Sequence, residues 1–223
     1  MKFGVVVFPG SNCDRDMIDT LRGELQQEVI PLWHKDKDIH MFSTGDCIVL
    51  PGGFSYGDYL RCGAIARFSP MMQSIIDFAN DGGKVFGVCN GFQILCESGL
   101  LPGVLLRNAH QQFVCKNVYI RTPGNNNSPS LKIPVAHGEG RYFAKKEELE
   151  KINSNNQVVY RYCNLDGTIT DEANPNGAME NIAGICNVTR NVFGMMPHPE
   201  RACSASLNNF DGKVVFNTLF GLS

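Results

Sequence analysis

The chain has 223 residues, of which 43% are hydrophobic and 19% charged, and its formal net charge at pH 7 is -2. These values are ordinary for a globular protein, and the length suits one large domain over residues 1–223 with a sizeable core. The weak negative charge and the lack of a Lys/Arg cluster indicate that the chain does not bind nucleic acid. No apolar run approaches the length that crosses a membrane, so we expect no membrane partner.

The nine cysteines are scattered, and no two of them form a C-x-x-C pair. The sequence therefore gives no support for a zinc site or a thioredoxin-like redox motif, and we expect no metal. Unpaired thiols in an α/β chain are typical of a reducing compartment. The apolar run near the N-terminus is too short for a signal peptide and lacks a small-residue cleavage site. We therefore expect a cytoplasmic protein.

The first hundred residues repeat a strand-helix pattern. Continuous apolar runs predict strands at residues 3–8, 28–33, 46–50 and 84–88. Helical spacing predicts one helix that Ser11 or Asn12 caps, and a second that opens at Ser69 or Pro70 and ends at residues 81–83. This repetition indicates the α/β class, with a mostly parallel central sheet, right-handed crossovers and helices on the faces of the sheet.

After residue 101 the pattern changes. Weak alternation predicts an antiparallel or half-exposed strand at residues 112–121, and residues 123–129 predict a turn or loop. Other segments predict short strands and two helices, one charged and exposed and one closing helix that packs on the sheet. The strands are at 158–163, 182–188 and 192–196, and the helices at 145–152 and 213–222. There is no internal repeat or domain linker.

A sharp turn joins a predicted strand to a predicted helix at Cys89. The turn reads Gly87-x-Cys89-x-Gly91, the thiol counterpart of the Gly-x-Ser-x-Gly nucleophile elbow. Side chains at the two glycines would collide with the neighbouring strand or helix. The N-terminus of the following helix favours a thiolate and an oxyanion. Most cysteines are inert core residues, so this motif alone leaves Cys89 open between a nucleophile and a buried thiol.

A cysteine nucleophile needs a base, and five histidines could supply it: His34, His40, His110, His137 and His198. We expect His34 and His40 on the surface, near a charged run, while His110 lies in a polar stretch. His137 and His198 are the stronger candidates. Glu200 follows His198 by two positions, so in an extended segment its carboxylate could orient the imidazole. Spacing alone also allows a turn histidine beside a surface glutamate.

A long segment, residues 54–68, leaves Pro51-Gly52-Gly53 at the end of a predicted parallel strand. One interpretation is an ordinary connection rich in glycine. The segment is long and aromatic for that, and the carboxyl ends of parallel strands are where α/β proteins bind ligands. We therefore expect this segment to form part of a site.

Together these motifs resemble class I, or triad, glutamine amidotransferases. Gly87–Gln93 matches their elbow, Pro51–Gly53 their preceding loop, and His198–Glu200 their C-terminal His-Pro-Glu. Order and separation agree over essentially the whole chain. The resemblance implies a flavodoxin-like sandwich with the nucleophile elbow at a strand-helix turn.

Longer motifs narrow the resemblance to the glutaminase subunits of phosphoribosylformylglycinamidine synthases, which act in purine (IMP) biosynthesis. These motifs are Pro51–Asp58, His137–Tyr142, Asn174–Gly177 and Met195–Arg201. The chain length matches the free-standing subunit and not the version that is fused to the synthetase.

The resemblance implies a mechanism. Cys89 attacks the side-chain amide of L-glutamine, His198 transfers the protons, and Glu200 orients His198. A γ-glutamyl thioester forms, and water hydrolyses it to glutamate. The ammonia passes to a synthetase subunit, of the large or the small type and accompanied by a small accessory subunit. That partner uses ATP and Mg to convert formylglycinamide ribonucleotide to the amidine.

The resemblance also assigns supporting residues. The oxyanion sits on backbone N–H groups of Asn90 and of Gly52 and Gly53, and Gln93 contacts the substrate. His137 and Glu139 lie near the site or at the synthetase contact, and the sequence does not separate these roles. Asp58 and Arg61 are interface or loop-ordering residues and not catalysts. The chain has no Walker loop, so we expect no cofactor in it.

Two other classes of function remain open. One is a different cysteine hydrolase, such as a peptidase, on the same scaffold; it would release no glutamate from glutamine. The other is a non-enzymatic interaction module with a relic elbow. In that case Cys89 would react with alkylating agents no faster than the other eight thiols.

Overall fold

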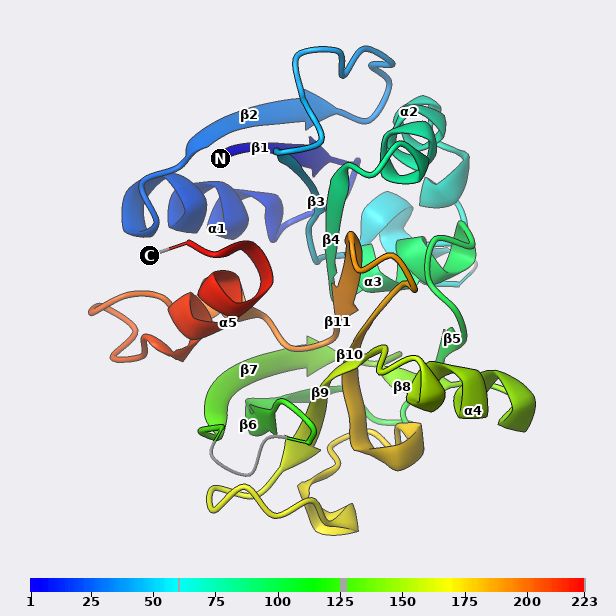
Figure 1. The fold of residues 1–223 in the computed structure, drawn as a ribbon, viewed down its shortest axis with the longest axis vertical. Helices are drawn as coiled ribbons and strands as arrows, with labels where there is room; N and C mark the ends of the chain where they lie inside the picture. Colours follow the sequence, from blue (N-terminus) through cyan, green and yellow to red (C-terminus); the bar gives the residue numbers. More distant parts are fainter. Residues whose placement is uncertain (60, 125–127, 223) are drawn as a thin grey trace. The chain divides into compact units, whose positions relative to one another are not determined.

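The computed structural model describes residues 1–59, 61–124 and 128–222, and it contains two compact units (Figure 1). One unit comprises Met1–Leu101 and Thr189–Gly194, and the other Pro102–Val188 and Met195–Ser223. Leu60 of the predicted site segment and residues 125–127 of the predicted turn lie outside the described residues. Among the helices described, none is long and apolar enough to cross a membrane.

The first unit is built on parallel strands. They are β1 (Lys2–Val7), β2 (Glu28–Trp33), β3 (Cys47–Leu50) and β4 (Lys84–Val88). The hydrogen-bonded order is β2-β1-β3-β4, followed by β11 (Val192–Met195), and β1 pairs with β2 and β3, and β3 with β4, in parallel register. β3 is buried along its whole length, as a strand covered on two faces must be. The predicted parallel sheet is confirmed, and the carboxyl ends of β3 and β4 lie side by side.

Three helices accompany these strands: α1 (Asp14–Asp19), α2 (Pro70–Asn80) and α3 (Asn90–Glu97). A π-helical turn, η1 (Thr20–Glu24), continues α1. The predicted cap of α1 is wrong: Cys13 occupies the cap position, and no side chain makes a capping bond there. The Asn12 carboxamide oxygen accepts a hydrogen bond from the Cys13 thiol instead, at 3.5 Å. The start and end of α2 agree with the prediction.

The second unit is built on antiparallel strands. They are β6 (Val114–Arg121), β7 (Leu131–His137), β9 (Val158–Cys163) and β10 (Ile182–Cys186), in the order β10-β9-β6-β7. Each neighbouring pair is antiparallel, which confirms the antiparallel strand predicted at residues 112–121. A separate antiparallel pair, β5 (Val104–Leu106) with β8 (Arg141–Phe143), was not predicted, because three residues are too few to show a period.

Two helices belong to the second unit, α4 (Lys146–Ser154) and α5 (Asp211–Phe220). α4 is charged but not fully exposed, since it buries Leu149 and Ile152. α5 packs against β7, and the carboxylate of Asp211 accepts a hydrogen bond from the backbone N–H of Lys132 at 2.7 Å. Short 3₁₀ helices complete the described structure: η2 (Ser55–Asp58), η3 (Ala66–Phe68), η4 (Asp171–Ala173), η5 (Met179–Asn181) and η6 (Pro199–Arg201).

Candidate active site

Cys89 stands between the end of β4 and the first residue of α3. Its backbone has φ 51° and ψ -105°, a conformation that residues with a side chain rarely adopt. Strained backbone of this kind persists where the surrounding structure fixes it, and it is concentrated at functional sites. The predicted strand-turn-helix position of Cys89 is confirmed.

The two glycines of the elbow are required by close packing. A Cβ at Gly91 would overlap the carbonyl oxygen of Leu50, and one at Gly87 would lie 2.7 Å from the backbone carbonyl group of Gly91. Backbone atoms cannot move away as a flexible side chain can. The helix that follows Cys89 therefore packs directly on the end of β3, and the collisions predicted for side chains at the two glycines are confirmed.

Asn90 joins the start of α3 to the segment that follows β3. Its side chain is buried; the carboxamide oxygen accepts from the backbone N–H of Ser55 at 3.4 Å, and the NH₂ group donates to Asp58 at 3.3 Å and to Gln93 at 3.1 Å. As the first residue of α3, Asn90 has a backbone N–H with no acceptor inside the helix. The side chain thus joins the loop to the helix, while the backbone N–H is left without an acceptor inside the helix.

The Gly52-Gly53 backbone comes close to the turn before α1. Gly53 has φ 121°, and a Cβ on it would lie 2.7 Å from the backbone nitrogen and the side-chain oxygen of Asn12. Gly52 is buried. Only glycine fits at residue 53, for its backbone conformation as well as for its space.

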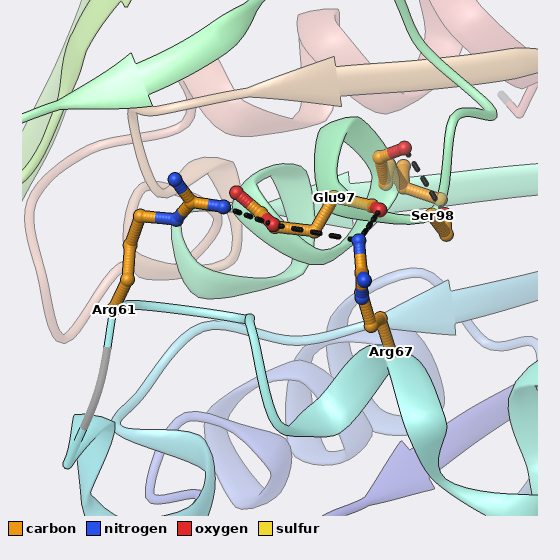
Figure 2. Close-up of polar contacts among 5 residues, drawn as sticks. Arg61, Arg67, Glu97 and Ser98 are labelled. Atoms are coloured by element: carbon orange, nitrogen blue, oxygen red, sulfur yellow. Dashed lines mark hydrogen bonds and ion pairs between the residues drawn. The ribbon is translucent and has the colours of Figure 1, made fainter.

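The segment after Gly53 is held to α3 at the far end of the helix as well (Figure 2). Arg61 contacts the Glu97 carboxylate at 2.6 Å, and Arg67 donates to the Glu97 backbone carbonyl at 3.0 Å. Glu97 is the last residue of α3, where the helix dipole disfavours a carboxylate, and its side chain is only 7% exposed. The two arginines compensate for that charge. The sequence did not predict this cluster, because nothing in the spacing of its members indicates contact.

His198 and Glu200 form a buried pair in the second unit. Nδ1 of His198 lies 2.7 Å from Oε1 of Glu200, and the two side chains are 1% and 0% exposed. The contact predicted from their spacing is confirmed. An Nδ1–H that donates to the carboxylate fixes the neutral tautomer, so the lone pair of the imidazole is on Nε2. The backbone N–H of His198 donates to the carbonyl oxygen of Pro134 at 2.8 Å. This hydrogen bond fixes the start of η6 on β7.

His137 occupies a buried polar network in the same unit. Its Nδ1 lies 3.1 Å from the Asn108 oxygen, and its Nε2 lies 3.5 Å from the Asn176 amide. Asn108 also donates to the His137 carbonyl at 2.9 Å. Burial, and secondarily the neighbouring His198, lowers the pKa of His137 to about 4. His137 is therefore a neutral imidazole held by two asparagines, and its place at the site or at the synthetase contact stays a prediction.

We expect His137 to make the stability of the protein fall at acidic pH. The folded pKa of about 4 is below the unfolded value of 6.5, so the unfolded chain binds more protons between these pH values. Stability is therefore lost as the pH falls from 6.5 to about 4, by about 3 kcal/mol. Denaturant titrations at several pH values measure the free energy of unfolding. A His137→Asn variant should show a shallower pH dependence, and an identical slope would contradict the assignment.

The remaining candidate residues, Glu139 and three histidines, lie in different surroundings. The carboxylate of Glu139 lies 3.6 Å from Nε of the exposed Arg107, and this ion pair does not include His137. His40 and His110 are exposed. The prediction of a surface position for His34 is wrong: its side chain is 3% exposed, because Tyr56 and Ser69 pack and hydrogen-bond on it from distant parts of the chain.

Comparisons with known proteins identify the family. The model for CobB/CobQ-like glutamine amidotransferase domains matches residues 1–214. Phosphoribosylformylglycinamidine synthase subunit PurQ of Synechocystis sp. is 52% identical over 222 residues, with 96% of this chain and 98% of that protein covered. PurQ of Salinibacter ruber is 51% identical over 226 residues, with 98% and 95% covered.

A chain in the structure of PurLQS from Thermotoga maritima superposes with a TM-score of 0.84 at 39% identity, and the match covers 99% of this chain and 97% of that one. This match confirms the flavodoxin-like α/β fold expected from the sequence. The chain therefore belongs to the PurQ family of phosphoribosylformylglycinamidine synthase subunits, within the CobB/CobQ-like glutamine amidotransferases.

Proposed function

We propose that this chain hydrolyses L-glutamine to glutamate and ammonia through Cys89. It is the glutaminase subunit of phosphoribosylformylglycinamidine synthase and serves purine biosynthesis. The observation that carries the proposal is that the chain is more than 50% identical to PurQ subunits over nearly its full length. It also has Cys89 at the strand-helix turn. The ammonia goes to a synthetase subunit, which converts formylglycinamide ribonucleotide to the amidine at the expense of ATP.

In the proposed reaction, the Cys89 thiolate attacks the side-chain carbonyl carbon of glutamine. Nε2 of His198 takes the thiol proton and returns a proton to the departing ammonia, while Glu200 stabilises the imidazolium. The γ-glutamyl thioester that remains is hydrolysed by water. Cys89 and His198 belong to different units, so this mechanism requires residues 1–223 to act as one domain. The match of one family model to residues 1–214 supports that requirement.

The oxyanion of each tetrahedral intermediate would be bound by backbone N–H groups of Asn90 and of the Gly52-Gly53 loop. Two observations support this: Asn90 is the first residue of α3, and its side chain reaches the loop at Ser55. Gln93, buried one turn further along α3, would contact the substrate. Donors of this kind stabilise an oxyanion most strongly when the loop is already in its active arrangement as the substrate arrives.

The assembly follows from the family. A synthetase subunit is the partner, as the match to a chain of PurLQS supports, and a small accessory subunit would complete the complex. We propose that ATP and Mg bind in the synthetase and not in this chain, and that the complex works in the cytoplasm.

We expect the isolated chain to be a poor glutaminase that the partner activates. The segment from residue 54 to 68 begins next to the proposed oxyanion loop and exposes Tyr59 and Phe68. A synthetase that binds this segment better in its active arrangement would raise activity, because a ligand shifts an equilibrium only by its differential affinity. Glutamate release should be slow from the chain alone and rise about 10²-fold or more with synthetase, nucleotide and ribonucleotide substrate.

The control is a Cys89→Ala chain in the same mixtures, which corrects for contaminating glutaminase. Full activity of the chain alone, unchanged by any addition, would contradict the activation by the partner. It would leave the assignment of Cys89 intact.

A further inference from the structure

We propose that Tyr56 and His34 are positioning residues for the glutaminase reaction. The hydrogen bond between them would hold the loop that presents the oxyanion-binding backbone of Gly53. This inference rests on the function proposed above, and it gives a role to two residues that the triad does not use.

The contact is well defined. The Tyr56 hydroxyl lies 2.6 Å from Nδ1 of His34, and the two rings meet at 90° with their centroids 5.4 Å apart. The Ser69 hydroxyl donates to the backbone carbonyl of His34 and lies 3.2 Å from the same Nδ1. Because the Ser69 proton is used on the carbonyl, an Nδ1 that carries the lone pair accepts from the Tyr56 hydroxyl. His34 follows β2 directly and Ser69 precedes α2, so the acceptor stands at the end of a strand and is joined to the start of a helix.

The charge state of His34 allows this direction of the hydrogen bond. Burial, and next the adjacent Lys35, lowers the pKa of His34, so the imidazole is neutral at pH 7. With Nδ1 as the acceptor, the proton is on Nε2. That atom is buried and has no hydrogen-bond partner among the described residues. Burying a polar atom without a partner is unfavourable. The buried imidazole is held through its other nitrogen, Nδ1, which contacts the Tyr56 hydroxyl.

The loop needs such a contact because its backbone is strained. Tyr56, Gly57 and Asp58 have φ values of 55°, 70° and 51°, three successive residues in the left-handed region. Tyrosine and aspartate are disfavoured there, so contacts from outside the loop must fix this conformation. Asn90 holds Ser55 and Asp58 from the side of α3. Tyr56 supplies contacts to other elements, through its hydroxyl to His34 and through its backbone N–H to Pro9 at 2.6 Å.

Gly53 is three residues before Tyr56, so a looser Tyr56 would misplace the Gly53 backbone. Removing an oxyanion donor outright typically costs ~10²–10³ in kcat. A donor that is present but poorly fixed should cost less, about 10-fold. The loss should be in kcat and not in KM, because the oxyanion exists only in the transition state and intermediate.

The test is a Tyr56→Phe variant, assembled with its synthetase partner and assayed with glutamine and with ammonia. We expect kcat for the glutamine reaction to fall about 10-fold with KM changed less than about twofold, and the ammonia reaction to be unaffected. Tyr119→Phe is the control: it removes the same group from β6, a strand of the other unit, to which we assign no part in the reaction. It should behave as the wild type.

Two variants at His34 extend the test. The carboxamide oxygen of asparagine can take the place of Nδ1, so His34→Asn should keep more activity than His34→Ala. In a chain that already carries Tyr56→Phe, His34→Asn should lower kcat little further, because the two residues act through one bond.

An unchanged kcat in Tyr56→Phe would overturn the proposal, as would a loss shared equally by the ammonia reaction. A Cys89→Ala complex that still used glutamine would instead overturn the proposed function itself.

Discussion

Replacing Cys89 with alanine should abolish glutamine-dependent synthesis in the assembled complex and leave ammonia-dependent synthesis intact. The variant has no sulfur to form the thioester, so no ammonia is released from glutamine. Amination with free ammonia takes place on the synthetase and does not need this thiol. The measurement is the rate of amidine formation with each nitrogen source, on complexes of confirmed composition.

The matched control for this prediction is Cys115→Ala. Cys115 is an exposed free cysteine on β6, in the other unit from Cys89. Its loss should affect neither reaction. Loss of both activities in a well-assembled Cys89→Ala complex would contradict the division of labour between the two subunits.

The second large effect is expected at His198, and a smaller one at Glu200. His198→Ala removes the group that takes the thiol proton, so glutamine-dependent kcat should fall by about 10³-fold or more. Glu200→Gln keeps an oxygen that can accept from Nδ1 but loses the charge that stabilises the imidazolium. The loss of kcat in Glu200→Gln should be at least about 10-fold smaller than the loss in His198→Ala, because the orienting acid of a triad matters least.

Steady-state kinetics of the two variants with glutamine measure this order, and His40→Ala, at an exposed histidine, serves as the control. The ammonia reaction should again be spared. Equal or greater damage from Glu200→Gln would show that the carboxylate does more than orient the base.

The parts of the fold that could be predicted are those in which the signal is local. Four continuous apolar runs identified the parallel strands, since a strand buried on two faces needs no alternation. The pair of β5 and β8 could not be found, because each strand has three residues. The cap of α1 was misassigned because Asn12 has a competing acceptor role toward Cys13, which only the folded chain shows.

The same limit applies to the site. Cys89, His198 and Glu200 lie in short motifs, so the sequence offered them as candidates, and the resemblance to the amidotransferase family assigned their roles. The surroundings of His34 could not be predicted, because its contacts come from residues 22 and 35 positions away. The contacts of Glu97 likewise could not be predicted, because Arg61 and Arg67 reach it from 36 and 30 positions away.

The central claim is that Cys89 carries a γ-glutamyl thioester during turnover, and it can be tested by trapping. The complex is mixed with isotopically labelled glutamine, quenched with acid during the steady state, and digested for peptide mass spectrometry. We predict a glutamyl mass increase on the Cys89 peptide, absent when Cys89 is replaced by alanine and absent from the peptides of the other eight cysteines. Steady glutamate production with no such adduct at Cys89, or with the adduct at another cysteine, would contradict the claim.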